Sequence, residues 1–112
     1  MKQLNTFIIK MNNHKASCRI TCTGNLTSSE VTDIREEISN CINKGYQTIY
    51  LDTKEVNNAD LSGINEVIHS AYTLGNASNQ FVLIYKAGSV IEKWVLTTGL
   101  DKFVQTAIVP AA

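Results

Sequence analysis

The spacing of apolar residues changes along the chain, and this change limits the possible folds more than any other feature of the sequence. Two early segments, 6–11 and 16–23, alternate apolar and polar residues with a period of two, which is typical of half-buried strands. We expect them to form an antiparallel hairpin that turns around Asn12, Asn13 and His14. The chain therefore opens with strands.

After the hairpin, strand-like and helix-like segments take turns. Residues 27–30 read Thr-Ser-Ser-Glu, a capping box, and apolar residues at helical spacing follow it as far as Lys44 and Gly45. A short strand over 48–52 leads to a second helix that begins after Asp60 and stops at Gly75. This part of the sequence predicts helix, strand and helix in that order.

The last third of the chain repeats the alternation. Residues 81–85 are apolar without a period, as in strands covered on both faces, so we expect helices to flank this strand. Ser89 is placed to cap a third helix, in which Ile91, Trp94 and Val95 have the spacing of core residues. A helical turn around residues 100–103 precedes a final strand over 105–109.

The resulting order, ββαβαβαβ, belongs to the α/β class. Strand-to-helix-to-strand crossovers are right-handed in nearly all proteins, so the order predicts a mixed β-sheet with helices packed on it. A chain of 112 residues with 44% hydrophobic residues suits one compact core, and we expect a single domain over residues 1–112.

Charge and cysteine content exclude several classes of partner and compartment. Ten basic and ten acidic residues give zero net charge without a basic cluster, which argues against nucleic acid as a partner. Residues 1–5 lack the features of a secretory signal, and no apolar run approaches the roughly 18 residues that insert into a membrane. Three cysteines, an odd number, suggest reduced thiols and not a disulfide framework. We expect a cytoplasmic protein.

Residue spacing also argues against local catalytic or metal chemistry. Ser62 and His69 share a helix face but lie roughly 10 Å apart along the axis, too far for a nucleophile and its base. Cys18 and Cys22 are about 13 Å apart on a strand and cannot share a zinc ion. Neither a phosphate-binding loop nor a dinucleotide fingerprint is present. The spacing therefore predicts no catalytic residues, no metal and no cofactor.

Polar residues collect where two predicted strands end, which is where open α/β sheets bind their ligands. The first group is Asp52, Asn57, Asn58, Asp60 and Ser62, and the second is Lys86, Gly88 and Ser89. Asp60 is placed as the N-cap of the second helix, whose first amides favour anions.

Leu61 and Gly63, in the first turn of that helix, each leave two interpretations open. Gly63 costs about 1 kcal/mol of helix propensity relative to Ala, so either a neighbouring strand or a ligand comes close to its backbone. The first helical position commonly lies near solvent, where a large apolar side chain gains little. Leu61 is therefore either part of the core or a contact for a partner.

The order of elements, with residues 49–52 (Ile-Tyr-Leu-Asp) and 56–64 (Val-Asn-Asn-Ala-Asp-Leu-Ser-Gly-Ile), resembles the STAS domain family of bacterial anti-sigma factor antagonists. In that family a strand ending in Asp is followed by Asp-Ser-Ser/Thr-Gly-Leu at the start of a helix. Residues 98–100 (Thr-Gly-Leu) with Phe103 are similar to a later family segment. The resemblance covers nearly the whole chain and implies a STAS-like fold.

The resemblance also implies residue roles. Asp52 and Asp60 match the family's acidic positions, Ser62 its second hydroxyl position, and Gly63 and Ile64 the glycine and the aliphatic residue that follow. Leu61 departs from the pattern, since the family's usual phosphoacceptor is the first hydroxyl residue after the Asp. The residues implied in partner binding are Asn57, Asn58, Asp60, Leu61, Ser62 and Gly63.

In similar proteins the unmodified domain docks on an anti-sigma factor, often a serine kinase, and an added phosphate of about −1.5 to −2 charges breaks the contact. Because Leu61 cannot accept phosphate, either binding is constitutive, or Ser62 is the phosphorylation candidate, or the module serves a different complex.

The sequence therefore predicts a non-enzymatic STAS module that acts in regulation of transcription as an anti-sigma factor antagonist, as a monomer or weak dimer. One alternative is a small cytoplasmic subunit of a transporter or other assembly. Another is an enzyme or phosphate sensor that uses the amides of residues 61–63.

Overall fold

The computed structural model describes residues 3–10, 16–76 and 80–111, with side chains over 17–74 and 80–111. The predicted order of elements is confirmed. The elements are β1 (Gln3–Lys10), β2 (Ala16–Leu26), α1 (Val31–Asn43), β3 (Thr48–Ala59), α2 (Leu61–Asn76), β4 (Gln80–Lys86), α3 (Val90–Thr98), the 3₁₀ turn η1 (Leu100–Lys102) and β5 (Gln105–Val109). The turn expected at Asn12, Asn13 and His14 falls outside the described residues.

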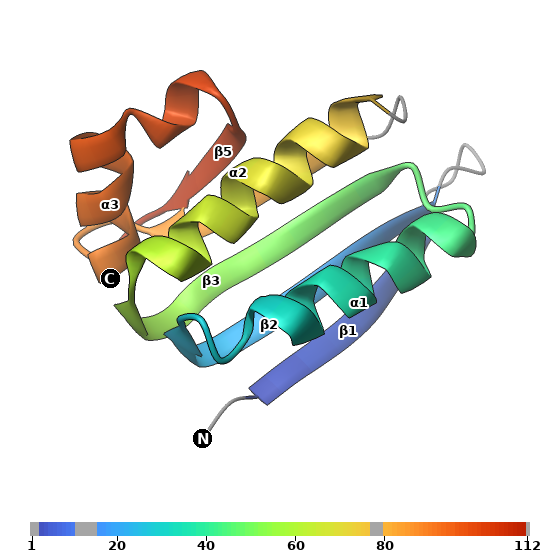
Figure 1. Cartoon of the computed structure of the whole chain (residues 1–112), viewed down its shortest axis with the longest axis horizontal. Helices are drawn as coiled ribbons and strands as arrows, with labels where there is room; N and C mark the ends of the chain where they lie inside the picture. The colour runs from blue at the N-terminus through green and yellow to red at the C-terminus, as the bar shows by residue number, and fades with distance from the viewer. Residues whose placement is uncertain (1–2, 11–15, 77–79, 112) are drawn as a thin grey trace.

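The five strands form one mixed sheet in the order β1-β2-β3-β4-β5. β1 pairs with β2 in the antiparallel sense, as the predicted hairpin requires, and the remaining neighbours are parallel. Figure 1 shows α1 and α2 running alongside each other across the sheet, with β3 behind them. Because the four parallel strands follow one another in order, their carboxyl ends meet at one edge of the fold.

The core lies on one face of this sheet. The buried cluster takes alternate residues from the central strands, such as Ile20 from β2, Leu51 from β3 and Leu83 from β4, together with residues of all three helices. On the opposite face Asp52 and Val82 are buried, and Tyr50 and Ile84 are partly buried. Among the described residues the helices contribute to one core, on the other face, so the expectation that helices flank residues 81–85 on both faces is wrong.

β2 and β3 extend further than their composition indicates. Pairing between them continues to Asn25–Asn58 and Leu26–Ala59 and is interrupted by two register shifts. The strand expected to end at Asp52 thus runs on to Ala59, so Asn57 and Asn58 belong to a strand end and not to a loop. Asparagine disfavours strands, but pairing with a neighbouring strand overrides this local preference.

The cysteines differ from the expectation of reduced thiols. Cys18 of β2 and Cys41 of α1 form a disulfide in the core, 23 residues apart in sequence. Cys22 is a buried free thiol, and burial, with a smaller effect of the Glu30 carboxylate, raises its pKa to about 12. Sequence spacing could not reveal the pairing because it depends on how α1 crosses β2.

Two helix signals are confirmed in detail. The Ser89 hydroxyl accepts a hydrogen bond from Glu92 N and caps α3, while Ile91 and Val95 are buried and Trp94 packs against the core. No helix within the described ranges is both long enough and apolar enough to cross a membrane.

Candidate protein-docking surface

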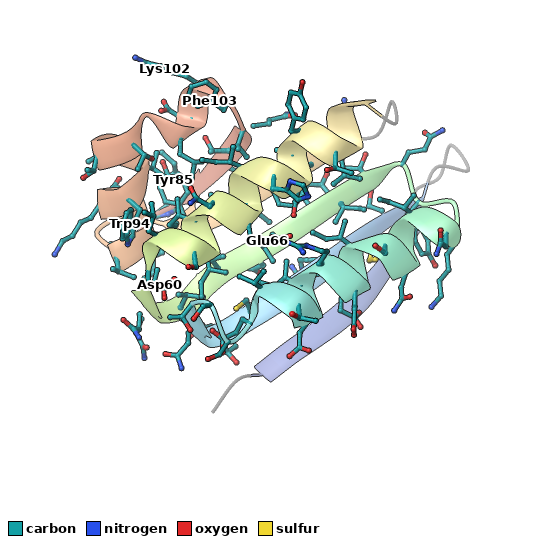
Figure 2. The ribbon with its side chains drawn as sticks, in the orientation of Figure 1. Asp60, Glu66, Tyr85, Trp94, Lys102 and Phe103 are labelled. Carbon is teal, nitrogen blue, oxygen red and sulfur yellow. A yellow bond between two sulfur atoms is a disulfide. The ribbon has the colours of Figure 1, made fainter. Side chains whose placement is uncertain are left out.

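The first turn of α2 is fixed against the end of β2 by its N-cap residue. Asp60 N donates to the Leu26 carbonyl oxygen at 3.2 Å, and the Asp60 carboxylate accepts from Gly63 N at 2.9 Å. Its second oxygen accepts from Ser28 N, 3.3 Å away in the segment before α1. The predicted N-cap is confirmed, and Figure 2 shows Asp60 at this end of α2. Asp60 therefore ties β2, α2 and the approach to α1 together.

Gly63 allows α2 to pack directly on the backbone of β2. A Cβ atom at this position would lie 2.6 Å from the Leu26 carbonyl carbon and closer still to the carbonyl oxygen. Of the two interpretations of Gly63, the structure supports close approach of a neighbouring strand. Gly63 is buried, so it positions the first turn and offers no surface to a partner.

Around this anchored turn, residues 57–62 are exposed or partly exposed. Leu61 has 56% of its surface accessible, and Asn57, Asn58 and Ser62 are exposed as well. We call Asn57, Asn58, Asp60, Leu61 and Ser62 the strand-end surface. Leu61 is thus a surface residue and not part of the core, and its role as a contact for a partner stays a prediction.

Asp52, the other acidic residue of the sequence motif, lies elsewhere. It is 3% exposed in the middle of β3, where its carboxylate accepts from Lys54 N at 3.1 Å and lies 3.6 Å from Lys54 Nζ. Seven residues separate Asp52 from Asp60, and the pairing with β2 shows the spacing: Asp52 pairs with Thr21 and Ala59 with Leu26, five positions further along β2, or roughly 16 Å at 3.3 Å per residue. The structure does not bring Asp52 into the strand-end surface.

The segment before α1 is held by a buried carboxylate. Glu30, 2% exposed, accepts from Thr27 N at 2.8 Å and from the Thr27 hydroxyl at 2.6 Å. These bonds are one half of the predicted capping box, and α1 itself begins one residue later at Val31. They fix the backbone that leads to Ser28, which contacts Asp60.

A charged pair that sequence reasoning missed joins α1 to α2. Glu66 of α2 is 3% exposed and binds the Arg35 guanidinium of α1 through both oxygens, at 2.5 Å and 3.2 Å. These hydrogen bonds, together with the charge of Glu66, raise the pKa of Arg35. Figure 2 shows Glu66 between the two helices. Only the three-dimensional packing of α1 on α2 reveals this pair, since its members are 31 positions apart in the sequence.

A shallow groove of about 440 Å³ follows the same helix–helix boundary. Its lining includes Ser28, Arg35, Ser62, Asn65 and His69, which are polar or charged. The groove therefore extends the strand-end surface, through Ser62, toward the Arg35–Glu66 pair.

The second predicted polar group, after β4, meets the strand-end surface from the other side. Lys54, Asn57, Lys86 and Ser89 line a second open groove of about 470 Å³. The Glu92 carboxylate accepts from Gly88 N at 2.8 Å and so satisfies an amide of this turn. The two polar groups that the sequence placed at one edge are brought together at Asn57.

This arrangement has the features of a contact surface. Over the described part of the chain, no group of three or more His, Cys, Asp and Glu side chains is placed to hold a metal ion. Ser62 and His69 both line the groove along α2. What the surface does offer is an exposed Leu near amide, hydroxyl and carboxylate side chains, which matches the apolar centre and polar rim of protein interfaces.

Comparisons with known proteins agree with this architecture. The STAS domain family model matches residues 8–110. The chain is similar to the structure of the anti-sigma factor antagonist SpoIIAA in its unphosphorylated form, with a TM-score of 0.68, 23% identity, and coverage of 96% of this chain and 88% of that one. The Bacillus cell fate determinant SpoIIAA in the phosphorylated form gives a TM-score of 0.63 at 24% identity, with coverage of 96% and 91%.

An anti-sigma factor antagonist from Mycobacterium paratuberculosis is similar at a TM-score of 0.72 and 13% identity, over 93% of this chain and 85% of that one. No curated protein sequence gives a match. At these identities the solved structures establish the fold, and the family model, which spans most of the chain, establishes the family. The chain belongs to the STAS domain family.

Proposed function

We propose that this chain is a non-enzymatic protein-binding module that acts as an anti-sigma factor antagonist, docking on an anti-sigma factor of the serine kinase type through the strand-end surface. The fold and family agree with such a role, because solved structures of similar fold carry that description. The observation that carries the proposal is the 56% exposure of Leu61 on a rigidly anchored helical turn.

Leu61 is suited to be the central contact. Fully burying a leucine side chain contributes about 1.5–3 kcal/mol, so its exposed half leaves a substantial part of that free energy for a partner. The anchoring of the turn by Asp60 and Gly63 limits the entropy lost on docking, because the backbone of the turn is already ordered. Asn57, Asn58 and Ser62 form the polar rim.

The missing hydroxyl at position 61 separates docking from phosphorylation at that position. A phosphate there would bring about −1.5 to −2 charges into the interface, and leucine has no oxygen to carry it. Ser62 is the hydroxyl residue that remains in this turn, and it is exposed beside the Arg35 groove. Phosphorylation at position 61 therefore cannot regulate docking, and Ser62 is the candidate phosphorylation site for such regulation.

A phosphate sensor at residues 61–63 is less well supported. Such a site would need free amides in the first turn of α2. The amide of Gly63 already donates to the Asp60 carboxylate, whose negative charge also opposes a bound anion.

The test begins with capture from an extract of the native cell and identification of bound proteins by mass spectrometry. The anti-sigma factor identified is then purified, and its affinity for the wild-type chain and for Leu61→Asp is measured by calorimetry. We expect Leu61→Asp to bind at least about tenfold more weakly, equivalent to about 1.4 kcal/mol. Aspartate in the first turn of a helix favours the helix, so the loss will not come from unfolding.

Leu96→Asp is the matched control, since Leu96 is 76% exposed on α3 and receives the same change of side chain. Its affinity should equal that of the wild type. Equal binding by Leu61→Asp, or capture of an ATPase subunit of a transporter in place of an anti-sigma factor, would contradict the proposal.

A further inference from the structure

β5 is an edge strand whose outer side is open. It lies last in the sheet order and pairs only with β4 among the described strands. Edge strands expose backbone amides and carbonyls that can pair with another strand, and proteins often block them with charged residues or proline. The β5 residues, Gln-Thr-Ala-Ile-Val, contain neither.

The pairing with β4 determines which backbone groups face outward. Ala87 N donates to the Val109 carbonyl at 2.9 Å, so the backbone groups of Val109 face β4. Because the direction alternates along a strand, Gln105 and Ala107 also face β4. Thr106 and Ile108 therefore direct their amides and carbonyls away from the sheet.

These four groups are complementary to themselves. If a second β5 lies antiparallel with a twofold axis at Ala107, Thr106 of each copy is opposite Ile108 of the other. Residues opposite each other at such positions exchange two hydrogen bonds, so the two pairs would form four. All outward groups of β5 are then satisfied by an identical strand, and the symmetric contact closes as a dimer.

The side chains favour the same occupant. No side chain of β5 carries a charge, so a twofold axis brings no like charges together, and the strand has no charge with which to select a different partner. Ile108 is 57% exposed and would cover Thr106 of the second copy. Phe103, 69% exposed, lies two residues before β5, and Figure 2 shows it next to Lys102.

We propose that two copies of this chain associate through antiparallel pairing of their β5 strands, centred on Ala107. The contact joins the two sheets at β5 and uses residues outside the strand-end surface. It therefore does not depend on the function proposed above.

The association is tested by sedimentation equilibrium of the purified full chain from about micromolar to millimolar concentration, the range in which a short strand pair is expected to dissociate. We expect the wild type to show a concentration-dependent monomer–dimer equilibrium. Ile108→Pro removes one outward-facing backbone N–H. Because this N–H makes no hydrogen bond to β4, the pairing of β4 with β5 is kept, and proline is tolerated on the open side of an edge strand. It should weaken the dimer at least about tenfold.

Ile108→Lys is a second variant in case the proline disturbs folding, which circular dichroism will report. It should also yield monomers, because lysine protects edges. Leu96→Lys, an exposed leucine on α3 given the same charge, is the control and should dimerise as the wild type does. A wild-type chain that stays monomeric throughout, or Ile108 variants that dimerise normally, would overturn the proposal.

The proposed docking on an anti-sigma factor and the proposed dimer can be refuted independently of each other. Leu61→Asp should lose the anti-sigma factor and keep the dimer, whereas Ile108→Lys should lose the dimer and keep the anti-sigma factor. Loss of both activities in one folded variant would overturn the assignment of the dimer contact to β5.

Discussion

Replacing Gly63 with alanine tests how α2 is anchored. Helix propensity alone predicts that Gly63→Ala stabilises the chain by about 1 kcal/mol, since Gly63 lies inside α2. The structure predicts the opposite sign. The new Cβ would lie 2.6 Å from the Leu26 carbonyl carbon and closer still to its oxygen, and ordinary contact begins near 3.4 Å, so a displacement of more than about 0.8 Å is needed. The obstacle is backbone and cannot rotate away.

The size of the effect follows from three contributions. Forcing an extra carbon into a packed contact costs about 1–3 kcal/mol. Moving α2 away from β2 also breaks the hydrogen bond from Asp60 N to the Leu26 carbonyl, which contributes about 0.5–1.5 kcal/mol. After the propensity gain of about 1 kcal/mol is subtracted, we expect a net loss of about 2 kcal/mol.

Urea denaturation followed by circular dichroism measures this loss. Ser62→Ala, the neighbouring position on the exposed side of the same turn, is the control for helix propensity and should leave stability unchanged or slightly higher. Gly45→Ala is the control for backbone conformation, because Gly45 has φ +88° with nothing within 4 Å of a Cβ, and should cost about 1 kcal/mol. A Gly63→Ala chain as stable as the wild type would refute the reasoning.

Three further predictions follow from single residues. Asp60→Ala should lower the free energy of unfolding by about 1 kcal/mol and with it the midpoint of thermal unfolding, whereas Asp60→Asn should retain most of the cap. Equal losses in the two variants would contradict the role of Asp60 as N-cap. The pKa of the Cys22 thiol is 9.0 in the unfolded chain and about 12 in the folded chain. Between these values the native state binds more protons than the unfolded state, so the free energy of unfolding should fall as pH rises through this range. Cys22→Ala should weaken this fall of stability with pH, which urea denaturation at several pH values measures. An unchanged pH dependence would assign the effect to other groups. Incubation with the captured kinase and ATP should add one phosphoryl group by intact mass, and Ser62→Ala should prevent it; no addition to the wild type would exclude Ser62 as the acceptor.

Features that depend on neighbours in sequence were predictable. The order of the elements, the Ser89 cap of α3 and the Asp60 cap of α2 follow from residue types within one or two turns, and the structure agrees with each. The need for close approach at Gly63 was also visible, because a glycine inside a helix is costly. Only the structure identifies Leu26 as the neighbour.

Features that depend on distant partners were not predictable. β3 continues through Asn57 and Asn58 because β2 pairs with it, and single-sequence propensity favours a loop there. The Cys18–Cys41 disulfide requires α1 to lie across β2. Similarly, the exposure of Leu61 depends on what packs over the first turn of α2, which no spacing rule provides.

The central claim is that a partner docks at the strand-end surface, and a nuclear magnetic resonance footprint tests it most directly. The ¹⁵N-labelled chain is titrated with the purified anti-sigma factor, and amide shifts are followed residue by residue. We predict the largest shifts at Asn57, Asn58 and residues 60–62, extending to Ser28, with little change along the middle of β3 near Asp52. Shifts concentrated elsewhere, with the amide of Leu61 unchanged at saturation, would contradict the account.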